Sequence, residues 1–148
     1  MHESVRIASP ADAAPLLALE DAARAHLIDQ RGGPAALAEQ PATRDWVAAI
    51  ADDQRSVFVA TLDDVVFGYL ELRYSAVGAA IVHQVYVDPE TRELGLGDWL
   101  IEAAIAAART RGCRVFEGFA LPGDRDTKNL FERAGITARK IIVSTRLD

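Results

Sequence analysis

The sequence predicts one mixed α/β domain whose sheet is mostly antiparallel. Several short stretches rich in β-branched residues follow one another with only turns between them, which is typical of an antiparallel meander. A later stretch instead reads strand, helix, strand, and such a unit pairs its two strands in parallel. The 148 residues contain no internal repeat and no plausible linker, so we expect a single domain over residues 1–148.

The first third of the chain predicts one strand and two helical regions. In order, we expect a strand at 5–7, a helix from Ser9 or Asp12 to about Leu27, a glycine-proline break at 32–34, and helical pieces at 35–39 and 43–51. Trp46 lies on the apolar stripe of the last piece. A tryptophan at such a position is expected in the core more often than in a substrate wall.

The middle of the chain predicts a three-stranded meander followed by a long helix. The expected strands are 56–61, 65–74 and 79–87, with a tight turn at Asp63-Asp64 and a bulge or close backbone approach at Gly68. From Asp98 onward, apolar side chains recur at helical spacing, namely Leu100, Ile101, Ala104, Ile105 and Ala108. Gly112 then ends the helix.

The last part of the chain predicts two more strands with a helix between them. We expect a strand at 113–120, a helix capped by Asp124 or Asp126 that runs to about Ala134, and a final strand within 137–146.

Composition excludes several classes of protein. A net charge of −6 argues against a general binder of nucleic acid backbones. The chain has no apolar stretch of the roughly 18 residues that a membrane span needs, and its polar start does not resemble a signal peptide. Cys113 is the only cysteine and no zinc-ligand cluster is present, so we expect no metal. We therefore expect a cytoplasmic protein.

The loop between residues 88 and 98 has the features of an anion site. Asp88 and Pro89 end the preceding strand, and the loop then reads R-x-x-G-x-G from Arg92 to Gly97. The first N–H groups of a helix have no internal partner, and glycines let an anion approach them closely. This arrangement predicts a pyrophosphate cradle, and the alternative is a strand-to-helix turn without a ligand.

The motif V-x-V-D-P-x-x-R-x-x-G-x-G, from Val85 to Gly97, resembles the acyl-CoA signature of the GNAT superfamily of N-acetyltransferases. The resemblance implies a GNAT-like sheet of about six to seven strands flanked by about four helices. It also implies acetyl-CoA as the acyl donor, with the pantetheine arm along Val85, Tyr86 and Val87. The expected contacts of the pyrophosphate are Arg92, Glu93, Leu94, Gly95, Leu96, Gly97 and Asp98.

A second stretch, from Phe131 to Ile136, resembles the Y-E-K-x-G-F ending of a late helix in the same superfamily. Asp124 stands where that pattern usually has asparagine, and helical spacing puts Lys128 on the same face, so both are expected near coenzyme A. Phe131 replaces a tyrosine that is thought to protonate the departing thiolate in many members. Another donor, an unprotonated leaving group, or a protein that binds acyl-CoA without catalysis would each account for this replacement.

His83 is the candidate general base. It precedes Val85 by two residues, so strand alternation predicts that it shares a face with Val85 and Val87, while Tyr86 faces the opposite side. An imidazole with an ordinary pKa of about 6.5 suits removal of a proton from an amine. The alternative is a histidine packed in the sheet and bonded to backbone. A backbone N–H near Val85 is the expected oxyanion donor.

The leading hypothesis is transfer of an acetyl group from acetyl-CoA to a primary amine. The rival from another class is a non-catalytic acyl-CoA-binding regulatory module, which Phe131 favours. Dinucleotide binding is a weaker third hypothesis, because it expects G-x-G-x-x-G and an acidic residue after a second parallel strand. Here the glycines lie in R-x-x-G-x-G and follow a meander. The expected partners are acetyl-CoA, an amine acceptor and a second copy in a homodimer, with no nucleic acid and no membrane.

Overall fold

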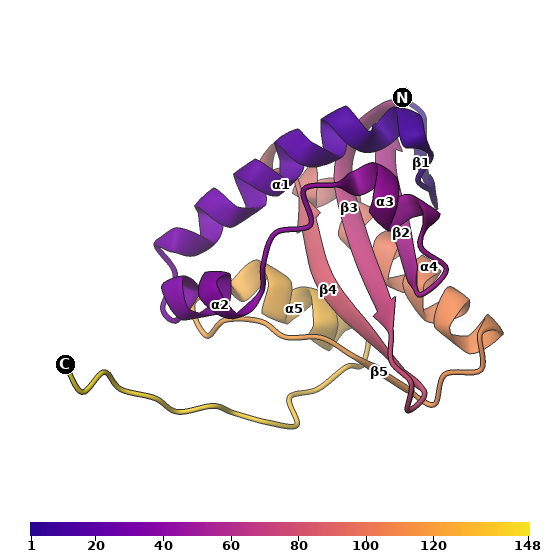
Figure 1. The fold of residues 1–148 in the computed structure, drawn as a ribbon. Coiled ribbons are helices and arrows are strands. Elements are labelled where there is room, and N and C mark those ends of the chain that lie inside the picture. Colours follow the sequence, from indigo (N-terminus) through magenta and orange to yellow (C-terminus); the bar gives the residue numbers. More distant parts are fainter.

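The computed structural model describes residues 1–148 and contains one five-stranded sheet (Figure 1). The strands are β1 (Glu3–Ile7), β2 (Arg55–Leu62), β3 (Val65–Tyr74), β4 (Ala79–Val87) and β5 (Val115–Glu117). Their order across the sheet follows the chain. The first three pairings are antiparallel, and β4 pairs with β5 in parallel. The expected mixed, mostly antiparallel sheet is confirmed, with five strands rather than six or seven.

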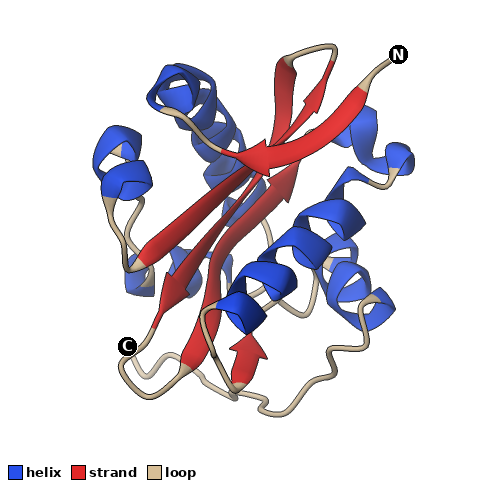
Figure 2. Ribbon diagram, turned by 90° about the vertical axis from the view of Figure 1, so that its right-hand side faces the viewer, coloured by secondary structure: helices blue, strands red, loops and turns tan.

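Helices cover both faces of this sheet (Figure 2). The α-helices are α1 (Ala13–Ile28), α2 (Gly33–Glu39), α3 (Trp46–Ala51), α4 (Leu96–Thr110) and α5 (Arg125–Arg133), and 3₁₀ turns occupy Pro10–Asp12 and Pro89–Leu94. Helices α1 and α3 pack on one face, while α4 packs on the other with α5 beside it. No helix is both long and apolar enough to cross a membrane.

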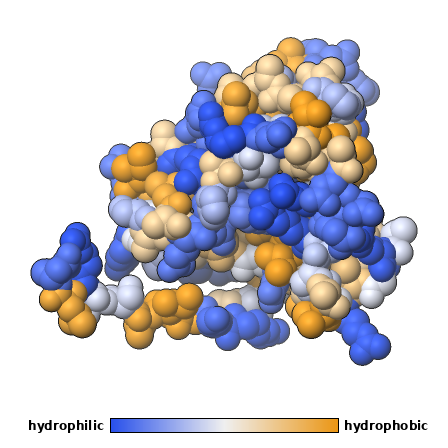
Figure 3. Space-filling model, viewed as in Figure 1, coloured by the Kyte–Doolittle hydropathy of each residue, from blue (hydrophilic) through white to orange (hydrophobic).

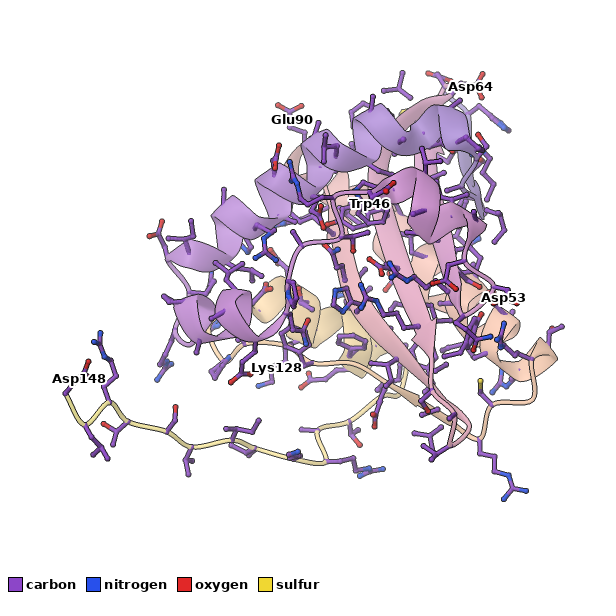
Figure 4. The ribbon with its side chains drawn as sticks, viewed as in Figure 1. Trp46, Asp53, Asp64, Glu90, Lys128 and Asp148 are labelled. Atoms are coloured by element: carbon purple, nitrogen blue, oxygen red, sulfur yellow. The ribbon has the colours of Figure 1, made fainter.

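Two hydrophobic cores lie on opposite faces of the sheet. The α4 side buries the helical stripe predicted from the sequence, including Leu100, Ile101 and Ala104. On the other side Trp46, which is labelled in Figure 4, is 1% exposed. Its ring packs edge-on against Tyr69, with ring centroids 5.4 Å apart. Trp46 is therefore a core residue, as expected.

Two β-bulges interrupt the alternation of side chains along the strands. Ala60 pairs with Gly68 and Thr61 with Val66, so the first bulge adjoins Gly68 as predicted. A Cβ on this glycine would come within 3.1 Å of the Tyr86 carbonyl oxygen. The second bulge lies in β4, where Gln84 pairs with Glu71 but Val82 pairs with Leu72. His83 is the extra residue there, and the sequence did not predict this bulge.

Both late strands differ from the sequence prediction. Residues 113–120 were expected to form one strand, but only Val115–Glu117 pair with β4. Residues 137–146 were also expected to form a strand, yet they run as an extended tail without any backbone hydrogen bond. A strand exists only where a partner completes its ladder, and no sixth strand lies beside β5 to receive the tail.

Candidate active site

The site begins where β5 separates from β4. The parallel ladder joins Ala79–Ile81 to Val115–Glu117 and then stops. The remaining residues of β4, 82–87, pair only with β3, so their other edge faces a cavity of about 230 Å³. The edge of Val85 to Val87, where the family resemblance predicts the pantetheine arm, therefore has no partner strand on this side.

Phe131 of α5 lies where the two strands part. Its ring is buried, and its Cζ atom would come within 2.6 Å of a Cβ placed on Gly118, directly after β5. Val82 would lie 3.3 Å from the same Cβ. Phe131 therefore belongs to the core on the α4 side and is absent from the lining of the cavity.

Gly118→Ala is expected to destabilise the fold by about 1–3 kcal/mol, because the added methyl overpacks the contact with the Phe131 ring. Urea unfolding of the variant and the native chain measures this difference. Phe131→Leu in the same chain removes the clashing ring atom and should recover part of the loss. A fully stable Gly118→Ala variant would contradict the described contact.

The cavity brings together most of the residues predicted for the site. Those that line it are His83, Val85, Tyr86, Val87, Arg92, Gly95, Gly97, Asp98 and Asp124. Four predicted ligands do not line it, namely Glu93, Leu94, Leu96 and Lys128. The Leu96 side chain is fully buried in the core, and Lys128 lies on an exposed part of α5. These four residues can therefore contact a ligand only through their backbone, or only where the ligand extends outside the cavity.

The glycine loop has the form expected of an anion cradle. Gly95 has φ +76°, a left-handed conformation that glycine adopts without strain, and α4 begins directly after it. The backbone N–H groups of the first helical turn have no partner within the helix. Gly97 packs tightly, because an added Cβ would meet Leu130 Cδ1 at 3.2 Å. The left-handed backbone thus explains the glycine at position 95, and the close contact with Leu130 explains the glycine at position 97.

Ion pairs attach this loop to α5. Arg92 Nη1 lies 2.5 Å from Asp126 Oδ2, and Arg92 Nε donates to the Val87 carbonyl at 3.3 Å. Arg133 Nε lies 2.9 Å from Asp98 Oδ1. The carboxylates of Asp126 and Asp98 therefore hold both arginines in place. Arg92 thus fixes the glycine loop, and a change in the position of the loop would also move α5.

His83 lies elsewhere than strand alternation predicted. Because of the bulge it does not share a face with Val85 and Val87, whose side chains belong to the α4-side core. It lies near Glu71 and Arg73 on the opposite face, which is also the face of Tyr86. The expectation that Tyr86 and His83 face opposite sides is therefore wrong.

The surroundings of His83 hold its imidazole neutral. Burial lowers the pKa of His83 below its ordinary value of 6.5, and the positive charges of Arg73 and Arg55 act in the same direction. Glu71 and the Pro41 carbonyl oppose this shift without cancelling it. A histidine that is neutral near pH 7 and lines a cavity can accept a proton.

A buried polar network closes the inner end of the cavity. Gln84 Nε2 donates to Glu20 Oε2 at 2.7 Å and to Glu71 Oε1 at 3.2 Å, and it lies 3.0 Å from Thr43 Oγ1. Tyr69 donates its hydroxyl to Gln84 Oε1 at 2.7 Å. Burial, together with the two glutamates, raises the pKa of Tyr69 well above its ordinary value.

Sequence reasoning missed this network. Its members come from α1, the loop before α3, β3 and β4, and no spacing connects them. The one available signal was Glu71, an acid flanked by leucines in a strand that packs on both faces. Both Glu20 and Glu71 are 0% exposed, so this end of the cavity carries two buried acids.

Glu20→Ala is expected to destabilise the fold by about 3 kcal/mol. The change leaves the Thr43 and Arg44 N–H groups, now 2.7 and 2.9 Å from the carboxylate, without an acceptor. Urea unfolding measures the loss. Asp21→Ala is the matched control, because this neighbouring acid is exposed and its removal should change stability by no more than about 0.5 kcal/mol. Equal losses in the two variants would contradict the structural role of Glu20.

A second histidine joins the two walls of the cavity. His26 of α1 places Nε2 3.7 Å from Asp124 Oδ1, and that nitrogen is buried without a hydrogen-bond partner. Asp124 caps α5 as predicted, with Oδ1 accepting from the Thr127 N–H at 3.4 Å. The His26 side chain as a whole is half-buried, with 34% of its surface exposed.

The described residues contain no group of three or more His, Cys, Asp or Glu side chains placed to hold a metal ion. The glycine cradle, the free edge of β4 and the cavity between them instead suit an elongated anionic ligand. These features fit coenzyme A, whose phosphates need N–H donors and whose arm needs an open strand edge.

Comparison with known proteins identifies the family. Residues 19–136 match the family model described as the acetyltransferase (GNAT) family. An uncharacterized N-acetyltransferase of Methanocaldococcus jannaschii is 30% identical over 63 residues, which span 43% of this chain and 28% of that relative. The chain belongs to the acetyltransferase (GNAT) family.

Solved structures share the fold over the whole chain. The aminoglycoside N-acetyltransferase AAC(6')-Iy, solved with a bisubstrate analogue of coenzyme A, is 18% identical with a TM-score of 0.74, and the match covers 100% of this chain and 99% of that one. A ribosomal-protein-alanine N-acetyltransferase from Brucella melitensis biovar Abortus 2308 is 17% identical with a TM-score of 0.72, covering 99% and 100%. The two proteins differ in acceptor, so the shared fold leaves the acceptor of this chain open.

Proposed function

We propose that this protein is an N-acetyltransferase that moves the acetyl group of acetyl-CoA directly to a primary amine. One observation carries the proposal: a single cavity joins the glycine cradle at the start of α4 to His83 in the β4 bulge. Acetyl-CoA supplies a thioester whose carbonyl carbon accepts the amine. The chain has to bind the donor, remove a proton and stabilise the developing negative charge.

Each of these tasks has a proposed residue. The backbone from Val85 to Val87 holds the pantetheine arm, and the N–H groups from Gly95 to Asp98 receive the pyrophosphate. His83 takes the proton from the amine, directly or through water, because its lowered pKa keeps it neutral near pH 7. The Val85 N–H is the proposed donor to the carbonyl oxygen.

The proposed acceptor is a small primary amine. Gln84 and Tyr69 line the cavity, and the fully buried Glu20 and Glu71 lie directly behind them. Arg44 lies 3.6 Å from Glu20, and Arg55 and Arg73 lie 3.5 and 2.7 Å from Glu71, so these arginines balance the two buried carboxylates and the acids do not by themselves select a charged acceptor. The structural neighbours named above act on amines of different kinds, which is compatible with this class and selects no member of it.

The second candidate function is a non-catalytic acyl-CoA-binding regulatory module. Phe131 favours it, because this side chain has no proton to donate and packs in the core. The thiol of coenzyme A is nevertheless a tolerable leaving group without an acid, since thiols have a pKa of about 8.5. His83 beside the cavity favours the enzyme.

One experiment separates the two functions. Calorimetry first measures binding of acetyl-CoA, and a mixed library of primary amines is then added while free thiol is followed. Binding with amine-dependent thiol release supports the transferase. Binding without release with any amine supports the regulatory module, and no binding contradicts both proposals.

We also propose that the protein acts in the cytoplasm as a homodimer. The outer edges of β1 and β5 have no partner strand within the chain, and unpaired edges readily receive a strand from another molecule.

A further inference from the structure

Apolar side chains gather around the cavity without belonging to either hydrophobic core. Leu27 of α1, Ala36 and Leu37 of α2, and Phe119 and Leu121 of the segment after β5 all line the cavity, and we call these five residues the apolar wall. None of them belongs to the two cores or packs against them. Four are half-buried and Phe119 is 40% exposed. Apolar side chains that stay open to a cavity are typical of a ligand site.

Direct contacts join the segments that carry the apolar wall. Gly32 lies in the turn between α1 and α2, and a Cβ added there would lie 3.6 Å from Leu121 Cδ2. Gly123 faces the same turn, because its added Cβ would lie 2.9 Å from Gln30 Oε1. The turn between the two helices therefore packs on the segment that precedes α5. The apolar wall is thus one surface built from both ends of the chain.

Arg24 of α1 holds α2 in position. Its Nη1 donates to the Gln40 carbonyl at 3.0 Å, and its Nη2 donates to the Leu37 carbonyl at 3.2 Å. The last carbonyls of a helix have no partner within the helix, so the guanidinium satisfies groups that would otherwise lack one. Figure 1 shows α2 directly below the C-terminal end of α1. Arg24 is therefore a positioning residue for the α2 part of the apolar wall.

The apolar wall continues toward His83. Ala36, Leu37 and Gln40 all line the cavity, which places them on the cavity side of α2. Gln40 is the C-cap of the helix, and the carbonyl of the next residue, Pro41, acts on the His83 imidazole. An amine whose nitrogen meets His83 therefore has the apolar wall within reach of its carbon body.

The acids near the apolar wall already have partners. Arg44, Arg55 and Arg73 pair with the two buried glutamates, and Figure 3 shows hydrophilic side chains across the middle of this face of the molecule. Asp124 also lines the cavity, but its oxygens accept from Thr127 and face His26.

These pairings leave no carboxylate free for a second ammonium group on the acceptor. The apolar wall itself contains no acid, and Arg24 beside it is a cation. A charge buried without a partner is costly, whereas a hydrocarbon gains from burial there.

We propose that the apolar wall receives the hydrocarbon body of the acceptor, so that the preferred acceptor is a primary amine with one amino group and an apolar body. The proposal deepens the transferase proposed above and rests on it. The acetyl group of the donor has a single methyl group beyond its carbonyl, which is too short to cover five side chains from three segments. The apolar wall therefore selects by the acceptor.

The first test is a series of straight-chain primary amines from ethylamine to hexylamine, with acetyl-CoA as the donor. The ammonium groups of these amines have nearly the same pKa, so the neutral fraction stays constant along the series. The kcat/KM for the amine should rise about fourfold with each methylene until the apolar wall is covered. Hexamethylenediamine has the length of hexylamine with a second ammonium group, and its kcat/KM should be lower by about tenfold or more.

Two variants show whether the apolar wall causes this trend. Leu37→Asn and Phe119→Asn should each reduce the increase per methylene and leave the affinity for acetyl-CoA unchanged. Phe119 lies outside the helices and strands, so its replacement does not depend on the stability of α2. Ala38→Asn is the matched control, because Ala38 is exposed on the same helix and does not line the cavity. This control should keep the full increase.

Calorimetry supplies a readout that does not need turnover. The amines are titrated into the chain saturated with coenzyme A, and the dissociation constant should fall about fourfold with each methylene. If no amine releases thiol but this trend is present, the transferase is overturned and the apolar site stands. If both the release and the trend are absent, both proposals are overturned.

Three further results would overturn the apolar acceptor and keep the transferase. The first is a rate that does not rise with the length of the amine, or that is higher with the diamine. The second is a rate that rises with the acyl chain from acetyl-CoA to butyryl-CoA but not with the amine, because the apolar wall would then receive the acyl group. The third is a full increase per methylene in both variants, or a loss of acetyl-CoA affinity in them, which would assign these side chains to the donor.

Discussion

His83→Gln is expected to lower amine-dependent turnover by about 10²-fold to 10⁴-fold while leaving the affinity for acetyl-CoA unchanged. Glutamine can still form hydrogen bonds at this position but cannot take a proton from an amine. His83 lies in the bulge beside the cavity, away from the glycine cradle, so donor binding should not depend on it. Steady-state rates of thiol release and calorimetry measure the two quantities separately.

The pH dependence gives a second readout of the same residue. The pKa of His83 is lowered, so the neutral form that accepts a proton persists below pH 6.5. The rate of the native chain should fall only as pH drops through that lowered pKa, apart from the ordinary titration of the amine. In His83→Gln this acidic limb should disappear.

The control for these measurements is His2→Gln, which changes an exposed histidine near the N-terminus. Its rate and pH profile should match those of the native chain. An unchanged rate in His83→Gln would remove this residue as the base, and a parallel loss of acetyl-CoA affinity would reassign it to binding.

Gly97→Glu is expected to weaken binding of acetyl-CoA by about 100-fold or more, because it places a carboxylate beside the N–H groups that receive the pyrophosphate. Gly97 lines the cavity at the first turn of α4. Calorimetric titration with acetyl-CoA measures the loss.

The matched control is Gly97→Gln, which has the same shape without the charge. Both side chains strain the contact with Leu130, where an added Cβ would lie 3.2 Å from Cδ1, so their thermal stabilities should be alike. The glutamine variant should lose about tenfold less affinity than the glutamate variant. Equal affinities in the two would show that no anion binds at this loop.

The sequence predicted the elements that local rules determine. Strand, Asp88-Pro89 break, glycine loop and α4 follow one another within about thirty residues, and each depends on side chains that are close in the chain. The cap of α5 by Asp124 and the bulge beside Gly68 were predicted for the same reason.

Features that depend on distant partners were not predicted. The bulge at His83 arises from the register with β3 and reverses the face on which the imidazole lies. The network of Glu20, Glu71 and Gln84 joins residues separated by up to 64 positions. The tail has the composition of a strand, but composition does not show whether a partner edge exists within the same chain.

The most direct test of the central claim is a titration of the isotope-labelled chain with acetyl-CoA, followed through its backbone amide resonances. The claim predicts that the largest shifts fall on residues 82–87 and 95–98, which line the free edge of β4 and the start of α4. Strands β1 and β2, on the far side of the sheet, should change little. Shifts confined to other parts of the chain, or no shifts at saturating acetyl-CoA, would contradict the assignment of this cavity as the donor site.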